Sequence, residues 1–301
     1  MRYSVPIEPP NDDREEVNVM KVGMNMLLWT THLTDEHFPL LEKIKQTGFD
    51  GVEIPLFEGD EAHYKNVRRV LDDLGLECTT VTVVGEDANP ISADAAIRRA
   101  AVDNLKLRLT HSAVLGSTLL CGPYHQPLGV FSGGGPTEDE KSWAAEVHRE
   151  AADAAQELNV TMGIEYLNRF ECYFLTTMKD AVDHVKRVNH PAFRTMYDTF
   201  HANIEEKDPI GVFTEFKDSI AHFHVSENDR GTPGKGHVPF LDTFKVARRA
   251  GYDGWLTIEA FGRALPDLAA ATRVWRDFFP TPDEVYVEGN RMVRDLWEQA
   301  D

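Results

Sequence analysis

Three carboxylates and one imidazole close consecutive apolar segments in the second half of the chain. They are Glu165, Asp198, His224 and Glu259, and the gaps between them span 33, 26 and 35 residues. A single acidic residue at a strand end more often caps a helix or faces solvent, but four at regular spacing indicate one shared site. Three like charges held together are costly unless a cation neutralises them. Oxygen ligands with one nitrogen suit Mn²⁺, Mg²⁺ or Co²⁺.

A second histidine precedes the first by two residues in the segment SIAHFHV, residues 219–225. Side chains at i and i+2 of a strand share one face, so His222 and His224 point the same way. We expect His224 to bind the metal and His222 to be a packed residue that orients the ligands by hydrogen bonding. The following loop, 225–239, is rich in Gly and Pro and is a candidate lid.

Strand-like and helix-like segments alternate along the whole chain and must position these residues. The hydrophobic pattern predicts strands at 22–29, 48–57, 77–84, 118–121, 160–165, 193–198, 219–224 and 251–261. It predicts helices at 35–47 behind an N-cap at Thr34, and at 60–74, 94–115, 138–158, 177–188, 203–217, 240–250 and 264–278, with a last helix at 283–299.

Eight strand–helix units in 301 residues favour one α/β domain, a closed (β/α)8 TIM barrel over residues 20–301. It would carry an N-terminal extension at 1–19 and an extra C-terminal helix. An open doubly wound sheet is the alternative, but it needs a Gly-rich phosphate turn after the first strand. The segment SGGGP at 132–136 is instead a loop between units. In a barrel, the C-terminal strand ends form the active site.

Composition and net charge argue against several classes of protein. The net charge of −19 disfavours nucleic acid as a partner, because its binders usually carry a basic surface. The sequence contains no run of 18 apolar residues, so no membrane span is predicted. The acidic N-terminus has no apolar segment typical of a signal peptide. Three scattered cysteines fit a reducing cytoplasm better than a disulfide scaffold.

The strand ends with their flanking residues resemble the ketose 3-epimerases, the D-tagatose/D-allulose 3-epimerase family of the xylose-isomerase-like barrel superfamily. The resemblance covers about residues 20–280, most loosely at 22–29. Its matching segments are GIEYLNRFE at 163–171, YDTFHANIEE at 197–206, HFHVSENDR at 222–230, PGKGHVPF at 233–240, GYDG at 251–254, IEAF at 258–261 and VWRD at 274–277.

The resemblance implies a ligand set and a substrate-contact set. The four strand-end residues would hold one divalent ion per subunit, with Mn²⁺ preferred over Mg²⁺ and Co²⁺. The positions that contact a sugar around O1, O2 and its carbonyl are Glu171, His201 and Arg230, and the aromatic walls of the pocket are Trp29 and Phe261. The resemblance further implies a homodimer or homotetramer that acts on a small sugar.

Epimerising a ketose at C3 requires removal of a proton next to the C2 carbonyl. A divalent ion can polarise that carbonyl, and the resulting cis-enediolate needs stabilisation where its charge develops. Glu165 and Glu259 come from strands with two units between them. They would therefore flank the substrate as the acid/base pair, with His201 and Arg230 holding O1 and O2.

Departures from the family pattern leave the substrate open. Asn25 and Met26 stand where the family usually has aromatic residues, and Ser226 and Asp229 stand where it usually has Gly and Asn. Two other reactions would use the same metal site, namely aldose–ketose isomerisation and cleavage of 3-keto-glycosides by a C-glycoside lyase. A metal nuclease resembling endonuclease IV and a non-catalytic sugar-binding barrel are the further alternatives.

Overall fold

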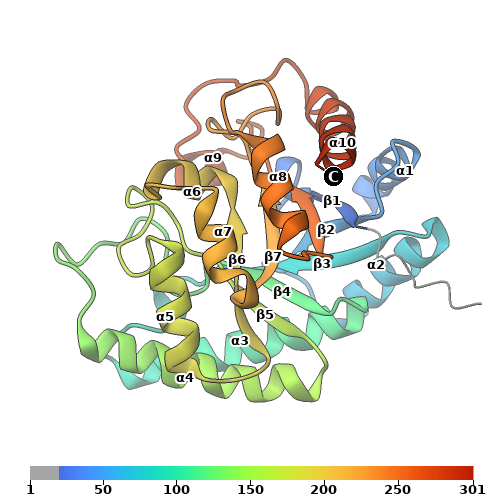
Figure 1. Ribbon diagram of the computed structural model, residues 1–301. Helices are drawn as coiled ribbons and strands as arrows, with labels where there is room; N and C mark the ends of the chain where they lie inside the picture. Colours follow the sequence, from blue (N-terminus) through green and yellow to red (C-terminus); the bar gives the residue numbers. More distant parts are fainter. Residues whose placement is uncertain (1–19, 301) are drawn as a thin grey trace, which may run out of the picture.

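The eight expected strands are all present in the computed structural model, which describes residues 20–300. The extension at 1–19 lies outside the described residues. The strands are β1 Lys21–Asn25, β2 Gly51–Pro55, β3 Glu77–Val81, β4 Leu119–Gly122, β5 Thr161–Ile164, β6 Phe193–Asp198, β7 Ile220–Val225 and β8 Trp255–Ile258. All pair in parallel and in sequence order, and β8 also pairs with β1, so the sheet closes into a barrel (Figure 1).

Helices follow the strands and surround the barrel. They are α1 Phe38–Gln46, α2 Glu61–Leu74, α3 Ala95–Leu115, α4 Glu138–Glu157, α5 Met178–Val188, α6 Thr199–Glu205, α7 Gly211–Phe216, α8 Phe240–Arg249, α9 Pro266–Ala271 and α10 Pro282–Gln299. The predicted (β/α)8 architecture is therefore confirmed. Among residues 20–300, no helix combines the length and the apolarity needed to cross a bilayer.

The ends of these helices follow from local side chains. Asp60 starts α2, where its carboxylate accepts the backbone N–H of His63 at 2.9 Å. Gly75 ends that helix with φ +65°, a left-handed conformation that favours glycine. At the start of α4, Thr137 and Glu140 each accept the other's backbone N–H in a reciprocal cap. Such signals explain why the sequence pattern located these helices closely.

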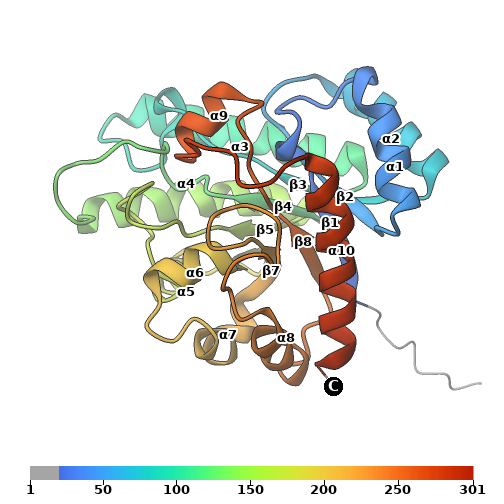
Figure 2. The ribbon, with the colours of Figure 1, turned by 90° about the horizontal axis from the view of Figure 1, so that it is seen from above.

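Two expected helices differ from prediction. The predicted helix 203–217 is divided between the end of α6 and the whole of α7. Pro209 lies between these two helices and disfavours helical backbone in the residue before it. The segment 264–278 is helical only in the short α9. The C-terminal helix α10 packs against α8, β1 and β8. Figures 1 and 2 place it between α8 and α1, so it completes the ring of helices rather than lying outside it.

Two buried histidines join α4 to α5 beneath the loop that follows β4. His148 Nδ1 lies 2.7 Å from His184 Nε2, and His148 Nε2 lies 3.3 Å from the Tyr124 carbonyl oxygen. The carbonyl can only accept, so His148 donates from Nε2 and accepts from His184 at Nδ1. The His148 ring is therefore neutral. Burial lowers the pKa of His148 to about 4 and that of His184 well below its ordinary value.

We expect this pair to make the free energy of unfolding depend on pH. In the unfolded chain, His148 takes up a proton below about pH 6.5, whereas in the folded chain it stays neutral down to about pH 4. The free energy of unfolding therefore falls as pH falls through that window. From pH 7 to pH 5 the loss is roughly 2 kcal/mol for this residue. Denaturant unfolding at the two pH values measures it. His148→Gln should remove that part of the loss, and substitution of the exposed His237 should not.

Candidate metal centre and active site

The four residues predicted from strand ends meet at the C-terminal mouth of the barrel. Glu165 directly follows β5, Asp198 ends β6, His224 lies near the end of β7 and Glu259 directly follows β8. All four side chains are buried, and one potential ligand atom of each lies within 4.8 Å of the others. Backbone bonds that extend the sheet hold two of them, since the N–H groups of Glu165 and Glu259 donate to neighbouring strands at 3.0 and 3.1 Å.

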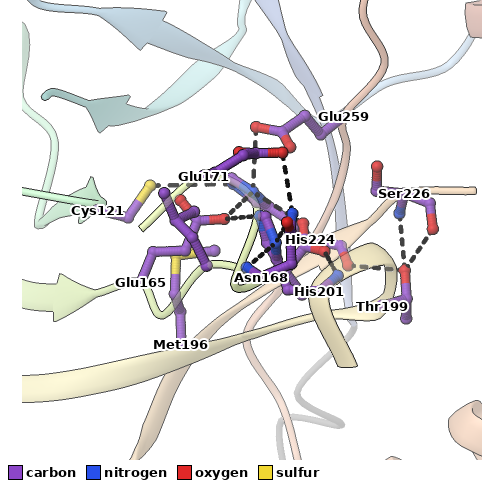
Figure 3. Close-up of polar contacts among 12 residues, drawn as sticks. Cys121, Glu165, Asn168, Glu171, Met196, Thr199, His201, His224, Ser226 and Glu259 are labelled. Atoms are coloured by element: carbon purple, nitrogen blue, oxygen red, sulfur yellow. Dashed lines mark hydrogen bonds and ion pairs between the residues drawn. The ribbon is translucent and has the colours of Figure 1, made fainter. Parts of the chain in front are cut away.

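The cluster has the properties of a cation site. His224 Nδ1 lies 3.3 Å from a Glu259 oxygen, 3.7 Å from Asp198 Oδ2 and 3.8 Å from a Glu165 oxygen (Figure 3). Neither His224 Nδ1 nor Asp198 Oδ2 has a hydrogen-bond partner, although both atoms are buried. Buried polar atoms are rarely left unpaired. A divalent ion bound between the carboxylates and the imidazole would satisfy both atoms, so the residues present fit one.

Asp198 serves the fold and the site at once. Its Oδ1 accepts the backbone N–H of His201 at 2.9 Å and so caps α6. Its Oδ2 faces the cluster. One oxygen of Asp198 therefore caps a helix, as acidic residues at strand ends often do, while the other oxygen remains available to a ligand.

Burial shapes the charges of the two glutamates. Burial, with the neighbouring charge of Glu259, raises the pKa of Glu165 well above its usual range. Burial also raises the pKa of Glu259 to about 7, although His224 and Arg230 oppose the shift. Both carboxyls therefore take up protons far more readily than exposed glutamates do, which is the property that a group exchanging protons near neutral pH needs.

Sequence reasoning missed a fifth important side chain, Glu53 of β2. One of its oxygens lies 2.8 Å from His224 Nε2, and the other lies 2.8 Å from His222 Nε2. It also accepts from Asn25 Nδ2 and Thr79 Oγ1, both at 2.9 Å. Because a carboxylate only accepts, it holds the Nε2–H of His224 and turns Nδ1 toward the cluster. His222 lies against the same carboxylate, but neither of its ring nitrogens has a hydrogen-bond partner, so its supporting role stays a prediction. A lone glutamate inside the apolar segment GVEIP was the only signal for Glu53.

Arg230 lies at the centre of the predicted substrate contacts. Its guanidinium donates to Glu259 Oε2 at 3.0 Å and to both oxygens of Glu171 at 3.2 and 3.3 Å. It lies 4.0 Å from the ring centre of Phe200 and 4.7 Å from that of Phe261. The structure therefore brings Arg230, Glu171 and Phe261 together, and Arg230 does not pair with the acidic residues of its own loop.

His201 is held in one orientation by the loop after β5. Its Nδ1 accepts the backbone N–H of Asn168 at 2.9 Å, and the Asn168 side chain holds Glu171 at 2.9 Å. Burial lowers the pKa of His201 to about 4, so the ring is neutral and carries its proton on Nε2. That nitrogen lies 3.6 Å from a Glu165 oxygen and 3.3 Å from Arg230 Nη2, so it borders the site beside the guanidinium.

A cavity of about 270 Å³ adjoins the cluster. Its polar lining includes Glu165, Glu259 and three predicted substrate-contact residues, Glu171, His201 and Arg230. Its apolar lining includes Leu27, Phe57, Val81, Leu128, Phe261 and Leu268. Trp29 is not among the residues that line this cavity, and its ring centre lies 5.8 Å from that of Tyr286 of α10. Its role as an aromatic wall stays a prediction.

Comparison with known proteins decides the family. The family model of the xylose isomerase-like TIM barrel matches residues 41–296. The chain belongs to the xylose isomerase-like TIM barrel family. Within it, the chain is 29% identical over 279 residues to the ketose 3-epimerase of Arthrobacter globiformis, covering 92% of this chain and 96% of that protein. It is 30% identical over 281 residues to a D-psicose 3-epimerase of Enterocloster bolteae, covering 90% and 92%.

Solved structures agree with these sequence matches. A D-psicose 3-epimerase from Clostridium cellulolyticum H10 superposes with a TM-score of 0.85 at 26% identity, over 92% of this chain and 99% of that one. The resemblance to ketose 3-epimerases drawn from the strand-end motifs is therefore confirmed. This xylose isomerase-like barrel is an isomerase-class enzyme.

Proposed function

We propose that the protein epimerises a free ketose at C3 through a cis-enediolate, with Glu165 and Glu259 as the acid/base pair. The observation that carries the proposal is the placement of these two carboxyls. Both border the cavity, both have a raised pKa, and they enter from strands on different sides of His224 (Figure 3). Inversion at one carbon needs such a group on each face.

A divalent ion would be held by Glu165, Asp198, His224 and Glu259, and Mn²⁺ is our first choice over Mg²⁺ and Co²⁺. When bound, the ion would polarise the C2 carbonyl and balance the carboxylate charge. The homodimer or homotetramer and the cytoplasmic location expected from the sequence stay predictions.

The protein residues would divide the proton transfer between them. One glutamate accepts the C3 proton while the other donates to the opposite face, and the roles exchange in the reverse direction. His201 Nε2–H and the Arg230 guanidinium are placed to donate to the oxygens at C1 and C2, where charge develops.

The cavity supports an unphosphorylated substrate. Arg230 is the one Lys or Arg side chain among the described residues that line it, and two glutamates already pair with it. Asp267, which also lines the cavity, would repel a phosphate. Solved relatives carry D-tagatose, D-fructose or D-allulose, which are free ketohexoses. We therefore propose free ketoses of this size as substrates.

Proton NMR in D2O tests the proposal directly. The Mn²⁺- or Mg²⁺-loaded protein is incubated with a panel of free ketoses, with their phosphates and with 3-keto-glycosides. We expect exchange at C3 and appearance of the C3 epimer with a free ketose. Exchange at C1 with formation of an aldose would make the protein an isomerase, and release of an aglycone would make it a lyase. Ketose binding without exchange or turnover of any substrate would indicate a sugar-binding barrel.

A further inference from the structure

Glu227 is a buried carboxylate that contacts the backbone of its own loop. It lies two residues after the end of β7, and the residue is only 1% exposed. The backbone N–H groups that donate to its two oxygens, at 2.9 to 3.1 Å, belong to Asn228, Gly234, His237 and Val238. One side chain therefore gathers both ends of the segment 228–238 around a single charge.

The glycines of this loop show that it is built around the carboxylate. A Cβ added at Gly236 would lie 2.5 Å from a Glu227 oxygen and 2.0 Å from the Asn228 side-chain oxygen. Any larger residue at 236 would force the carboxylate away from its partners. Gly234 has φ +86°, a conformation that side chains rarely adopt. The glycines at 234 and 236 allow this close wrap around Glu227.

Arg230 lies inside this segment and has an unusual backbone. Its φ of +62° is left-handed although it is not a glycine. Its N–H donates to the Glu227 carbonyl at 2.9 Å, and its carbonyl accepts from the Phe261 N–H at 3.0 Å. Such a conformation persists only where surrounding contacts determine it, and it recurs at functional sites. Here the loop turn directs the guanidinium to Glu171 and Glu259.

We propose that Glu227 is a positioning residue that sets the place of Arg230 in the active site. It would do so by keeping the segment 228–238 closed around its carboxylate, as a fixed brace rather than as an opening lid. The role of Arg230 toward substrate rests on the proposed function. The closure of the loop does not, so the two can be tested apart.

Glu227→Gln is the first test. If the amide oxygen keeps the three partners of Oε1, the amide NH₂ faces the N–H of Gly234, which places two donors together. We expect amide hydrogen exchange of the segment 228–238 to become at least about 10-fold faster, because a buried charge-assisted bond is lost. Exchange in β7 should not change. Unchanged protection of the loop would overturn the brace.

A double-mutant cycle on kcat/KM tests the link to Arg230. Glu227→Gln alone should lower kcat/KM for the ketose about 10-fold or more. If Glu227 acts through Arg230, the same change should have almost no effect in an Arg230→Ala background. Additive losses would show a general structural role and overturn the proposal. The matched control is Glu284→Gln, which removes a charge beside the same loop while its amide oxygen can still accept from Thr232 Oγ1, so exchange and activity should stay near wild type.

A second variant and a binding measurement separate failure of the brace from failure of the epimerase proposal. If Glu227→Gln does not fold, Gly236→Ala replaces it, since the added methyl displaces the same carboxylate. If the wild type turns over no ketose while Glu227→Gln still unprotects the loop, the epimerase proposal fails and the brace stands. In that case, loss of the Arg230 position is read from the affinity for a bound ketose in the same four proteins.

Discussion

Glu259→Gln should lower kcat for ketose epimerisation by about 10³-fold or more, since general acid/base catalysis supplies up to roughly 10⁴. The amide has nearly the shape of the carboxyl but cannot accept the C3 proton. The variant is measured at saturating Mn²⁺, with bound metal determined separately, because Glu259 is also one of the four proposed metal ligands. With each C3 epimer supplied alone, Glu259→Gln and Glu165→Gln should fail to exchange the proton of opposite epimers.

The control for this result is Glu205→Gln. Glu205 is also paired with an arginine, Arg169, at 2.8 Å, but it does not line the cavity. Its loss should change kcat less than about 3-fold, as expected of a pair with one exposed partner. A metal-loaded Glu259→Gln protein that keeps more than a tenth of wild-type kcat would contradict the assignment of Glu259 as a proton-transfer group.

The second large effect concerns the metal, and Asp198→Asn isolates it. Asparagine keeps an oxygen for the cap on the His201 N–H, so α6 should still start correctly. It replaces Oδ2 with an uncharged NH₂ group that cannot ligate and that faces His224 Nδ1. We expect the affinity for Mn²⁺ to fall by more than about 100-fold, which is the upper range for loss of an outer hydrogen-bond partner. Isothermal titration calorimetry measures it.

Asp208→Asn provides the matched comparison. Asp208 accepts the backbone N–H of Gly211 at 2.9 Å and helps to start α7, away from the metal cluster. Both variants change an aspartate that accepts a backbone N–H at the start of a short helix, but only one removes a proposed ligand. Comparable Mn²⁺ affinities for the two would show that Asp198 holds only the helix, and would move the proposed metal site elsewhere.

Much of this fold could be predicted because the signals are local. Helix caps such as Asp60 and Thr137 are side chains that bond to backbone a few residues away, so short patterns reveal them. Prediction failed where a local pattern had a competing interpretation. The periodicity of 203–217 continues through Pro209, which divides the helix in two.

The sequence by itself determined the barrel, the family and which four residues gather at its mouth. Parallel strands in regular alternation with helices place all their C-terminal ends at one rim, so spacing along the chain becomes proximity in space. Only the tertiary structure decided which oxygen faces which nitrogen. Glu53 contacts His224 from a strand 171 positions earlier in the chain. Arg230 bypasses its acidic loop neighbours for Glu171 and Glu259. Such partners depend on backbone direction and burial, which no pattern of residue types contains.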